Sequence, residues 1–212
     1  MNNISDIRKE YKLKSLDEKD VLPDPFDQFE KWWEDALAST IDEVNAMTLA
    51  TANKQGKPAA RVVLLKGFNK DGFIFFTNYQ SNKGAELLEN PQACLVFFWK
   101  ELERQIRIDG IVEKVSKEES DEYFRSRPEG SKIGAWSSPQ SKIINSREVI
   151  EKNIIATKER FNGVEIKRPS HWGGYIVKPS AIEYWQGRSS RLHDRILYTK
   201  LEDVWKIERM AP

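Results

Sequence analysis

The densest group of chemically active residues lies between Trp185 and Arg195, where the chain reads Trp-Gln-Gly-Arg-Ser-Ser-Arg-Leu-His-Asp-Arg. Arg191 and Arg195 each offer a planar guanidinium group that suits phosphate or carboxylate. His193, between them, is able to donate, accept or transfer a proton. Gly187 and two serines predict a loop between strands. We therefore expect an anion-binding loop, although a solvated basic loop has the same composition.

Two other segments carry groups suited to an anion. The run from Arg61 to Lys66 is apolar inside and cationic at both ends. Tyr123 and Arg127 are four residues apart on a predicted helix, so they share a face, and Ser131 follows the helix end. Two hydroxyl groups and a guanidinium group are thus placed to bind one phosphate. On spacing alone, strand-end charges in solvent and a helical surface pair explain the same residues.

Composition limits the classes of function. The chain has 212 residues, with 34 Lys+Arg, 33 Asp+Glu and a net charge of +1, so general electrostatic attraction to nucleic acid is not indicated. Anion recognition must then come from local clusters. The 7 tryptophans and 10 phenylalanines suit a β-rich core or stacking on a flat ligand.

Cysteine and motif content narrow the chemistry further. Cys94 is the single cysteine and lies in an apolar run, which favours a buried structural thiol and a reducing compartment. No metal-ligand spacing, signal region or membrane-spanning run is present, so we expect no metal, no membrane and a cytoplasmic protein. The chain also lacks a dinucleotide fingerprint, a P-loop and a nucleophile elbow.

The positions of these residues depend on a mainly β fold. Residues 1–24 predict a mobile N-terminal arm, and 25–212 a single domain. Asp24 and Pro25 start a helix whose apolar stripe, Phe26, Phe29, Trp33 and Leu37, is expected to pack in the core. Helices are also expected at 81–90, 116–127 and 146–161, and strands at 46–52, 59–67, 73–77, 92–99, 104–115, 173–177, 181–186, 195–199 and 204–208.

The strands follow one another through tight turns, so parallel winding is not expected. The first three predict an antiparallel meander, and Gly110 a bulge. The best architecture is a closed antiparallel β-barrel with peripheral helices.

Taken together, these segments resemble the pyridoxine (pyridoxamine) 5′-phosphate oxidase family, from about Ile7 to Pro212. The most specific piece is Trp185-Gln186-Gly187 with Arg191-Leu192-His193-Asp194-Arg195. The resemblance implies an FMN-binding split barrel, antiparallel and Greek-key-like, with FMN at the interface of a homodimer. It implies oxidation of pyridoxine or pyridoxamine 5′-phosphate to pyridoxal 5′-phosphate by O2, giving H2O2 (and ammonia from the amine), in vitamin B6 biosynthesis or salvage.

The resemblance also implies roles for individual residues. Arg191 and His193 would be catalytic and lie against the substrate ring. The residues expected at FMN are Arg61, Val62, Val63, Leu64, Leu65, Lys66, Phe76, Thr77, Asn82, Lys83, Gln105, Gln140, Ser141, Trp185 and Arg195. Those expected at the substrate are Arg8, Tyr11, Lys66, Tyr123, Arg127, Ser131, Arg191 and His193.

Two positions depart from the family pattern, and one has no matched role. Asn82 replaces a frequent arginine, which removes a charge-assisted contact worth roughly 1.5–3 kcal/mol if nothing replaces it. Phe76 replaces a common tyrosine, which keeps the ring and loses the hydroxyl group. Arg188 matches no family role, so we expect a solvent-facing charge.

Three alternative functions remain open at the level of sequence. One is a split-barrel flavoprotein with another substrate or electron acceptor, which would not need Tyr123, Arg127 and Ser131. Another is a carrier that binds flavin or pyridoxal phosphate without turnover. The weakest is a nucleic-acid-binding β-barrel, against which the near-neutral charge argues.

Overall fold

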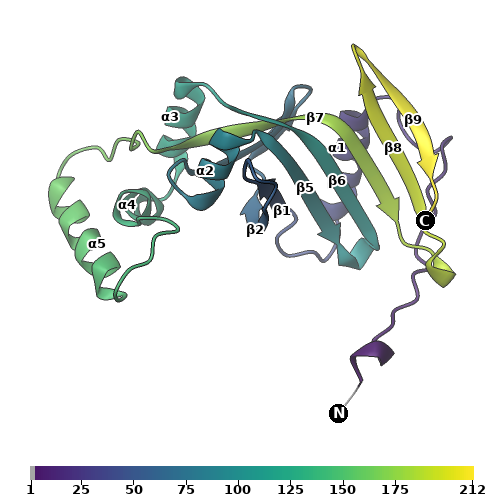
Figure 1. Ribbon diagram of the computed structural model, residues 1–212, viewed down its shortest axis with the longest axis horizontal. Helices are drawn as coiled ribbons and strands as arrows, with labels where there is room; N and C mark the ends of the chain where they lie inside the picture. Colours follow the sequence, from purple (N-terminus) through teal and green to yellow (C-terminus); the bar gives the residue numbers. More distant parts are fainter. Residues whose placement is uncertain (1–2) are drawn as a thin grey trace.

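A computed structural model describes residues 3–212 and shows a curled antiparallel sheet with helices at its margins (Figure 1). The strand order is β2-β1-β5-β6-β7-β4-β3, and β8 and β9 extend the sheet from β7. The described strands are β1 (Ala46–Ala52), β2 (Pro58–Leu64), β3 (Gly67–Asn69), β4 (Gly72–Asn78), β5 (Gln92–Trp99), β6 (Arg104–Lys114), β7 (Trp172–Gln186), β8 (Asp194–Leu201) and β9 (Val204–Met210). The mainly β architecture predicted from the sequence is confirmed.

The two edge strands of the sheet are connected by the polypeptide chain and not by a ladder of hydrogen bonds. The two edge strands of the main path, β2 and β3, are joined by Leu65 and Lys66. The amide of Leu65 donates to the carbonyl of Asn45, and that of Lys66 to Ile74, both at 2.8 Å. The predicted closed barrel is therefore split at this bend, where one chain segment passes from one edge of the sheet to the other.

Both hairpins of the predicted meander are present: β1 pairs with β2, and β3 pairs with β4 across the predicted turn at residues 69–72. The predicted strand 59–67 is divided at Leu65 and Lys66 into β2 and β3, however, and the other edge of β4 pairs with β7, with Phe76 opposite Gly174. The helix α2 (Asn82–Glu89) then carries the chain across to β5, which pairs with β1. This crossover gives the Greek-key-like order, and it depends on contacts distant in sequence that hairpin signals do not contain.

Strand β7 is one 15-residue strand where two short strands were predicted. Pro179 interrupts the sequence pattern, but it lies at a bulge where the register with β6 shifts between Asp109 and Gly110. A proline is tolerated there because the bulge removes the need for its missing N–H. The predicted bulge at Gly110 is confirmed, and a Cβ at that position would lie 2.3 Å from the carbonyl oxygen of Lys178.

The helix α1 (Pro25–Leu37) fills the concave side of the sheet. Phe29 is fully buried, with its ring 4.9 Å from that of Phe73. The predicted stripe is correct at Phe26 and Phe29 but wrong at Leu37, which is 61% exposed. A period of 3.6 residues turns the buried face toward Trp32 and Ala36 by the second half of the helix.

The caps predicted at Ser81 and Ser116 are confirmed, whereas α4 (Glu129–Ser137) and α5 (Glu148–Arg160) have no side-chain cap. Ser116 accepts the amide of Glu119 at the start of α3 (Lys117–Ser126). The helix α4 was not predicted, because its two glycines and the preceding proline suggest a loop. It packs beside α5 at the end of the molecule remote from β8 and β9 (Figure 1). Short 3-10 turns are η1 (Ile4–Asp6), η2 (Lys100–Leu102) and η3 (Ser189–Arg191).

Two smaller findings concern predictions about environment. Cys94 is partly and not fully buried, and burial followed by contact with Asp109 raises its pKa to about 12, so it stays a thiol. Across residues 3–212, no helix has both the length and the apolar character needed to span a membrane.

Candidate functional site

A cavity of about 680 Å³ opens between β2, β4, α3 and α4. Its volume is typical of a small-molecule site. It gathers twelve of the residues predicted from the family resemblance: Arg61, Val62, Val63, Leu64, Lys66, Phe76, Thr77, Lys83, Tyr123, Arg127, Ser131 and Gln140. The residues expected at FMN and those expected at a substrate phosphate therefore share one cavity.

Lys83 supplies a partly buried positive charge to this cavity. Its Nζ donates to Thr77 Oγ1 at 3.2 Å and to Ser81 Oγ and Gln140 Oε1 at 3.3 Å, all of them neutral oxygens. Burial, and then the nearby Arg61, lower the pKa of Lys83. Because these partners are neutral, they do not cancel the positive charge of the ammonium group, which can therefore bind an anion.

Arg61 lies beside Lys83 but is already paired. Its Nη2 is 3.0 Å from Glu86 Oε2, and its Nη1 donates to the carbonyl of Leu49 at 3.2 Å and to Thr51. These contacts fix the guanidinium group on β2, and Glu86 cancels part of its charge. Arg61 and Lys83 together form an anchored cationic corner.

Arg127 is the best-placed group for a second anion. Its guanidinium carbon lies 4.4 Å from the ring centroid of Trp172, and its buried Nη1 has no hydrogen-bond partner within residues 3–212. Burial lowers its pKa. A buried donor without a partner is costly, so this nitrogen marks a position that suits a ligand oxygen.

Aromatic rings form one wall of the cavity. Phe76 stacks on Tyr123 with centroids 3.9 Å apart and planes at 16°, and Trp172 continues the stack at 5.6 Å from Phe76. The ring that Phe76 retains therefore has a packing role without the hydroxyl group. Sequence reasoning did not include Trp172, Ser126 or Pro128 among the lining residues. Trp172 precedes a glycine pair at the start of β7, a signal of close packing that was available.

The second group of predicted residues lies at the far end of β7. A cavity of about 570 Å³ there is lined by Arg8 and Tyr11 of the arm and by Arg188, Arg191 and His193 with four neighbours. The Trp185 and His193 ring centroids are 4.5 Å apart, and Tyr11 packs edge-on to Trp185 at 5.7 Å. The structure thus brings the arm residues and the His193 loop together as predicted.

The geometry of His193 defines its neutral form. Its Nδ1 accepts the backbone amide of Arg188 at 3.1 Å, so the neutral ring carries its proton on Nε2. Burial, and then the positive charge of Arg191, lower its pKa. Ser190 and Arg191 have left-handed backbone conformations, with φ of 55° and 62°, which is uncommon for residues with side chains.

The prediction that Arg188 is a solvent-facing charge is wrong. Its Nη1 lies 2.7 Å from Asp194 Oδ2, and its side chain is 42% exposed. Asp194 also pairs with Arg209 at 3.0 Å and accepts the amide of Leu16. Burial would raise the pKa of Asp194, but these contacts lower it overall. Arg188 therefore belongs to the network that holds the loop and the arm.

Six residues predicted at FMN lie outside the first cavity. Gln105 and Arg195 flank Trp185 in the sheet register, at the far end of β7. Arg195 Nε donates to buried Glu183 at 2.7 Å, so it is not part of the Arg61 and Lys83 corner within one chain. Of the others, Leu65 is 4% exposed and packs in the core, Asn82 is exposed on α2, and Ser141 is exposed after α4 with φ of 69°.

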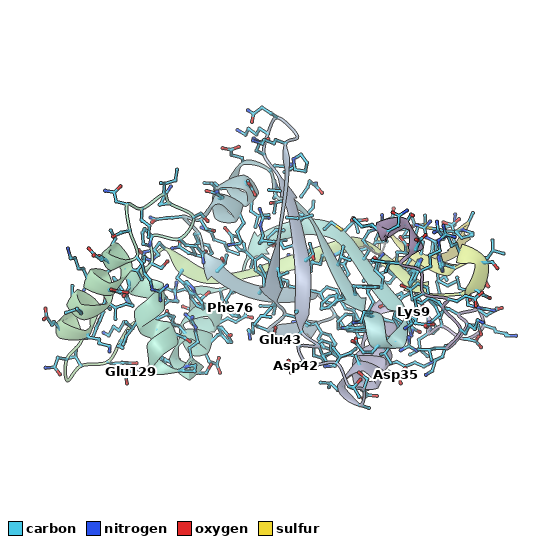
Figure 2. All side chains as sticks on the ribbon, turned by 90° about the horizontal axis from the view of Figure 1, so that it is seen from below. Lys9, Asp35, Asp42, Glu43, Phe76 and Glu129 are labelled. Carbon is cyan, nitrogen blue, oxygen red and sulfur yellow. The ribbon has the colours of Figure 1, made fainter. Side chains whose placement is uncertain are left out.

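The two groups of residues are too far apart to meet in one chain. Trp172 lines the first cavity and Trp185 belongs to the second group, thirteen positions along the same strand. A strand rises about 3.3 Å per residue, so the two are separated by roughly 40 Å along β7. Figure 2 shows Glu129 toward one end of the molecule and Lys9 of the arm toward the other, with Phe76 between them.

The curled, split antiparallel sheet defines the chain as a split-barrel protein, and the comparisons with known proteins give its family. Residues 33–160 match the family model described as pyridoxamine 5′-phosphate oxidase. Residues 172–212 match the model described as the pyridoxine 5′-phosphate oxidase C-terminal dimerisation region. The chain belongs to the pyridoxine/pyridoxamine 5′-phosphate oxidase family, which makes it an oxidoreductase with FMN as its cofactor.

Individual relatives extend over the whole chain. The chain is 60% identical to a pyridoxine/pyridoxamine 5′-phosphate oxidase of Nostoc sp. over 99% of this chain and 98% of the relative. It is 54% identical to the oxidase of Burkholderia lata over 100% of both chains. Among solved structures, PhzG from Burkholderia lata 383, in complex with tetrahydrophenazine-1-carboxylic acid, superposes with a TM-score of 0.88 at 28% identity, covering 94% of this chain and 99% of PhzG.

Proposed function

We propose that this protein oxidises pyridoxamine 5′-phosphate and pyridoxine 5′-phosphate to pyridoxal 5′-phosphate, as a pyridoxal 5′-phosphate synthase. The substrate CH2–NH2 or CH2–OH group loses two electrons and two protons, O2 becomes H2O2, and water releases ammonia from the amine. The observation that carries the proposal is that Arg127 Nη1, which has no hydrogen-bond partner in residues 3–212, lies in the same cavity as the anchored Arg61 and Lys83. Two separate cationic positions suit two phosphates, one on FMN and one on the substrate.

The residues of the first cavity fit FMN. Among the described residues, the hydrogen-bond partners of Lys83 are all neutral, and Arg61 is fixed beside it, so the flavin phosphate would bind at this corner. The flavin ring would lie along Val62 to Lys66, and Thr77 and Gln140 offer further polar contacts. FMN supplies acceptance of a hydride and reoxidation by oxygen.

The substrate phosphate would bind next to the aromatic wall. Arg127 would donate from Nη1, and Lys66 would add a second positive charge. Tyr123 and Ser131 each offer a hydroxyl group. Ser131 lies in the first turn of α4, where the helix dipole also favours an anion.

A second copy of the chain would complete the site. The matched dimerisation region covers β7, β8 and β9, which carry Trp185, Arg191, His193 and Arg195. These residues cannot reach the first cavity of their own chain across roughly 40 Å. In a homodimer they would face the partner's cavity, where Gln105, Trp185 and Arg195 would contact the flavin.

Arg191 and His193 would position the reacting carbon of the substrate. His193 is held by the Arg188 amide and presents Nε2–H as a donor. Its lowered pKa keeps it neutral near pH 7, so it does not add a charge beside Arg191. Arg8 and Tyr11 would cover the substrate from the arm.

The decisive experiment is an absorbance spectrum of the purified, FMN-loaded protein before and after anaerobic addition of pyridoxamine 5′-phosphate. We expect the flavin absorbance near its visible maximum to bleach and then to return when oxygen is admitted, with formation of pyridoxal 5′-phosphate. A flavin that stays oxidised would leave the chain as a binding protein without turnover.

The likeness to PhzG raises a second candidate, oxidation of a tricyclic carboxylic acid. One comparison favours the first candidate: within Burkholderia lata, this chain is 54% identical to the pyridoxine/pyridoxamine 5′-phosphate oxidase and 28% identical to PhzG. Steady-state turnover separates them. We expect high activity with pyridoxamine 5′-phosphate and little with pyridoxamine, which lacks the phosphate that Arg127 would bind.

A further inference from the structure

Glu103 is a buried acid in an uncommon backbone conformation, outside both cavities. It follows the turn η2 between β5 and β6, with φ of 54° and ψ of 39°, and is 2% exposed. Left-handed backbone is costly for a residue with a side chain, so it persists only where other contacts hold it. Glu103 has such contacts on both its carboxylate and its carbonyl group.

The two ends of Glu103 join two separate segments. Its Oε2 accepts the backbone amides of Lys12 at 2.8 Å and Leu13 at 3.0 Å, and Oε1 lies 3.3 Å from Lys9 Nζ. Its carbonyl oxygen accepts the amide of Gly187 at 2.7 Å, next to the loop that carries His193. One residue thus ties the arm to the start of that loop.

These bonds determine where Tyr11 lies. Tyr11 directly precedes Lys12, and its ring rests on the backbone of Gly187, where a Cβ would lie 2.7 Å from Tyr11 Cγ. The same ring packs against Trp185 and has its centroid 6.0 Å from that of His193. The position of Tyr11, where the arm lines the His193 cavity, therefore depends on the hydrogen bonds from the Lys12 and Leu13 amides to Glu103.

We propose that Glu103 is a positioning residue that holds the arm, and through it Tyr11 and Arg8, over the substrate position. The inference deepens the proposed function and rests on it for the substrate's place. Because the carboxylate binds the arm, through two backbone amides and Lys9, and does not itself line either cavity, its loss changes how well substrate is retained and not the reacting groups. The expected signature is a raised KM with kcat little changed.

The test uses the full-length, FMN-loaded protein and the variants Glu103→Gly and Glu103→Gln. Glycine suits a φ of 54°, so Glu103→Gly removes the carboxylate without straining the turn. Glutamine keeps an oxygen acceptor but loses the charge. Glu101→Gln is the matched control, because Glu101 lies in the same turn and pairs only with exposed Lys100. Hydrogen exchange at Lys12 and Leu13, KM and kcat are measured for each.

For Glu103→Gly we expect exchange at both amides to be faster by about tenfold or more and KM for pyridoxamine 5′-phosphate to rise roughly tenfold, with kcat within about twofold. Glu103→Gln is expected to lie between this variant and the wild type, and Glu101→Gln to match the wild type. Unchanged exchange, or a fall in kcat at unchanged KM, would overturn the proposal. If Glu103→Gly does not fold, the same readouts on Glu103→Gln decide it.

The exchange measurement also separates this inference from the proposed function. It does not need turnover, so it reports whether Glu103 holds the arm even if pyridoxamine 5′-phosphate is not oxidised. Absence of oxidation in the wild type would overturn the proposed function, while the exchange rates would still support or refute the hold on the arm.

Discussion

Arg127 illustrates how a single nitrogen can indicate a ligand. Its Nη1 is buried without a hydrogen-bond partner in residues 3–212, and the guanidinium group is held in place by packing against the ring of Trp172. A hydrogen bond to a charged group contributes about 1.5–3 kcal/mol. Arg127 is therefore preorganised for an anion that the chain itself does not supply.

We expect Arg127→Ala to raise KM for pyridoxamine 5′-phosphate by roughly 10- to 150-fold, the range that corresponds to one charge-assisted hydrogen bond. FMN content should stay unchanged, because Arg61 and Lys83 remain. Arg125→Ala, on the exposed face of the same helix, is the control. Steady-state kinetics and flavin absorbance provide both readouts, and an unchanged KM would favour a substrate without phosphate.

His193 gives a prediction about charge. Burial and then Arg191 lower its pKa below the ordinary 6.5, so the ring stays neutral to a lower pH than a free histidine. Arg191→Met removes a positive charge that opposes protonation, so the pKa of His193 should rise toward 6.5 while the contribution of burial remains. NMR titration of the His193 ring protons measures the shift. A pKa that falls or stays constant would show that Arg191 does not act on the ring electrostatically.

At the level of elements, β7 is held to its neighbours by glycines. A Cβ at Gly174 would lie 2.7 Å from Phe76 Cε1 and 2.6 Å from Val115 Cγ2, so the side chain of Phe76 would have to move within the cavity wall. Gly134, in the interior of α4, has open space around its Cα. The two glycines therefore respond to the same substitution in opposite ways.

We expect Gly174→Ala to destabilise the protein by about 1–3 kcal/mol through overpacking and to weaken FMN binding through Phe76. Gly134→Ala should stabilise it by about 0.5–1 kcal/mol, since alanine restricts the unfolded chain and suits a helix. Urea unfolding and FMN titration test both variants. Equal effects of the two substitutions would contradict the packing described for β7.

Much of the element pattern was predictable from local signals. The strand at 46–52 has the predicted bounds, and Ser81, Ser116 and Gly110 have their predicted roles as caps and bulge. The helix α4 was missed because glycine and proline are weak helix formers, and packing against α5 outweighs that preference. Strand β7 was divided because Pro179 resembles a turn when its partner strand is unknown.

The candidate site was predicted less evenly than the fold. Spacing allowed Tyr123, Arg127 and Ser131 to bind one phosphate but equally allowed a surface pair, and the family resemblance favoured the phosphate; in the structure the three line one cavity. The assignment of residues to FMN came from the family resemblance. Sequence patterns could not show that β4 pairs with β7, nor that Arg195 and Lys83 lie at different ends of one chain, because both depend on long-range pairing.

At the level of the whole molecule, the distance between the two groups of site residues has a consequence for mixed dimers. Arg127 of one chain and His193 of the partner would serve the same site. In a dimer of Arg127→Ala and His193→Ala chains, one site would carry both defects and the other would carry neither.

We therefore expect two variants with little activity at low substrate concentration, Arg127→Ala and His193→Ala, to regain activity when they are unfolded, mixed in equal amounts and refolded together. Random pairing gives half of the dimers as mixed and one intact site in each, so activity should reach roughly one quarter of wild type at low substrate concentration. Refolding each variant alone is the control. No recovery from the mixture would contradict a site shared between chains.

The pairing of β4 with β7 also bears on the order of folding. Phe76 lies opposite Gly174, so the wall of the first cavity forms only after segments almost one hundred residues apart have met. Such contacts tend to form late on the folding pathway. FMN should therefore slow unfolding and leave the refolding rate nearly unchanged, because the flavin stabilises contacts that the transition state lacks. Stopped-flow refolding and unfolding in urea, with and without FMN, measure the two rates. Faster refolding with FMN would show that this cavity forms before the transition state of folding.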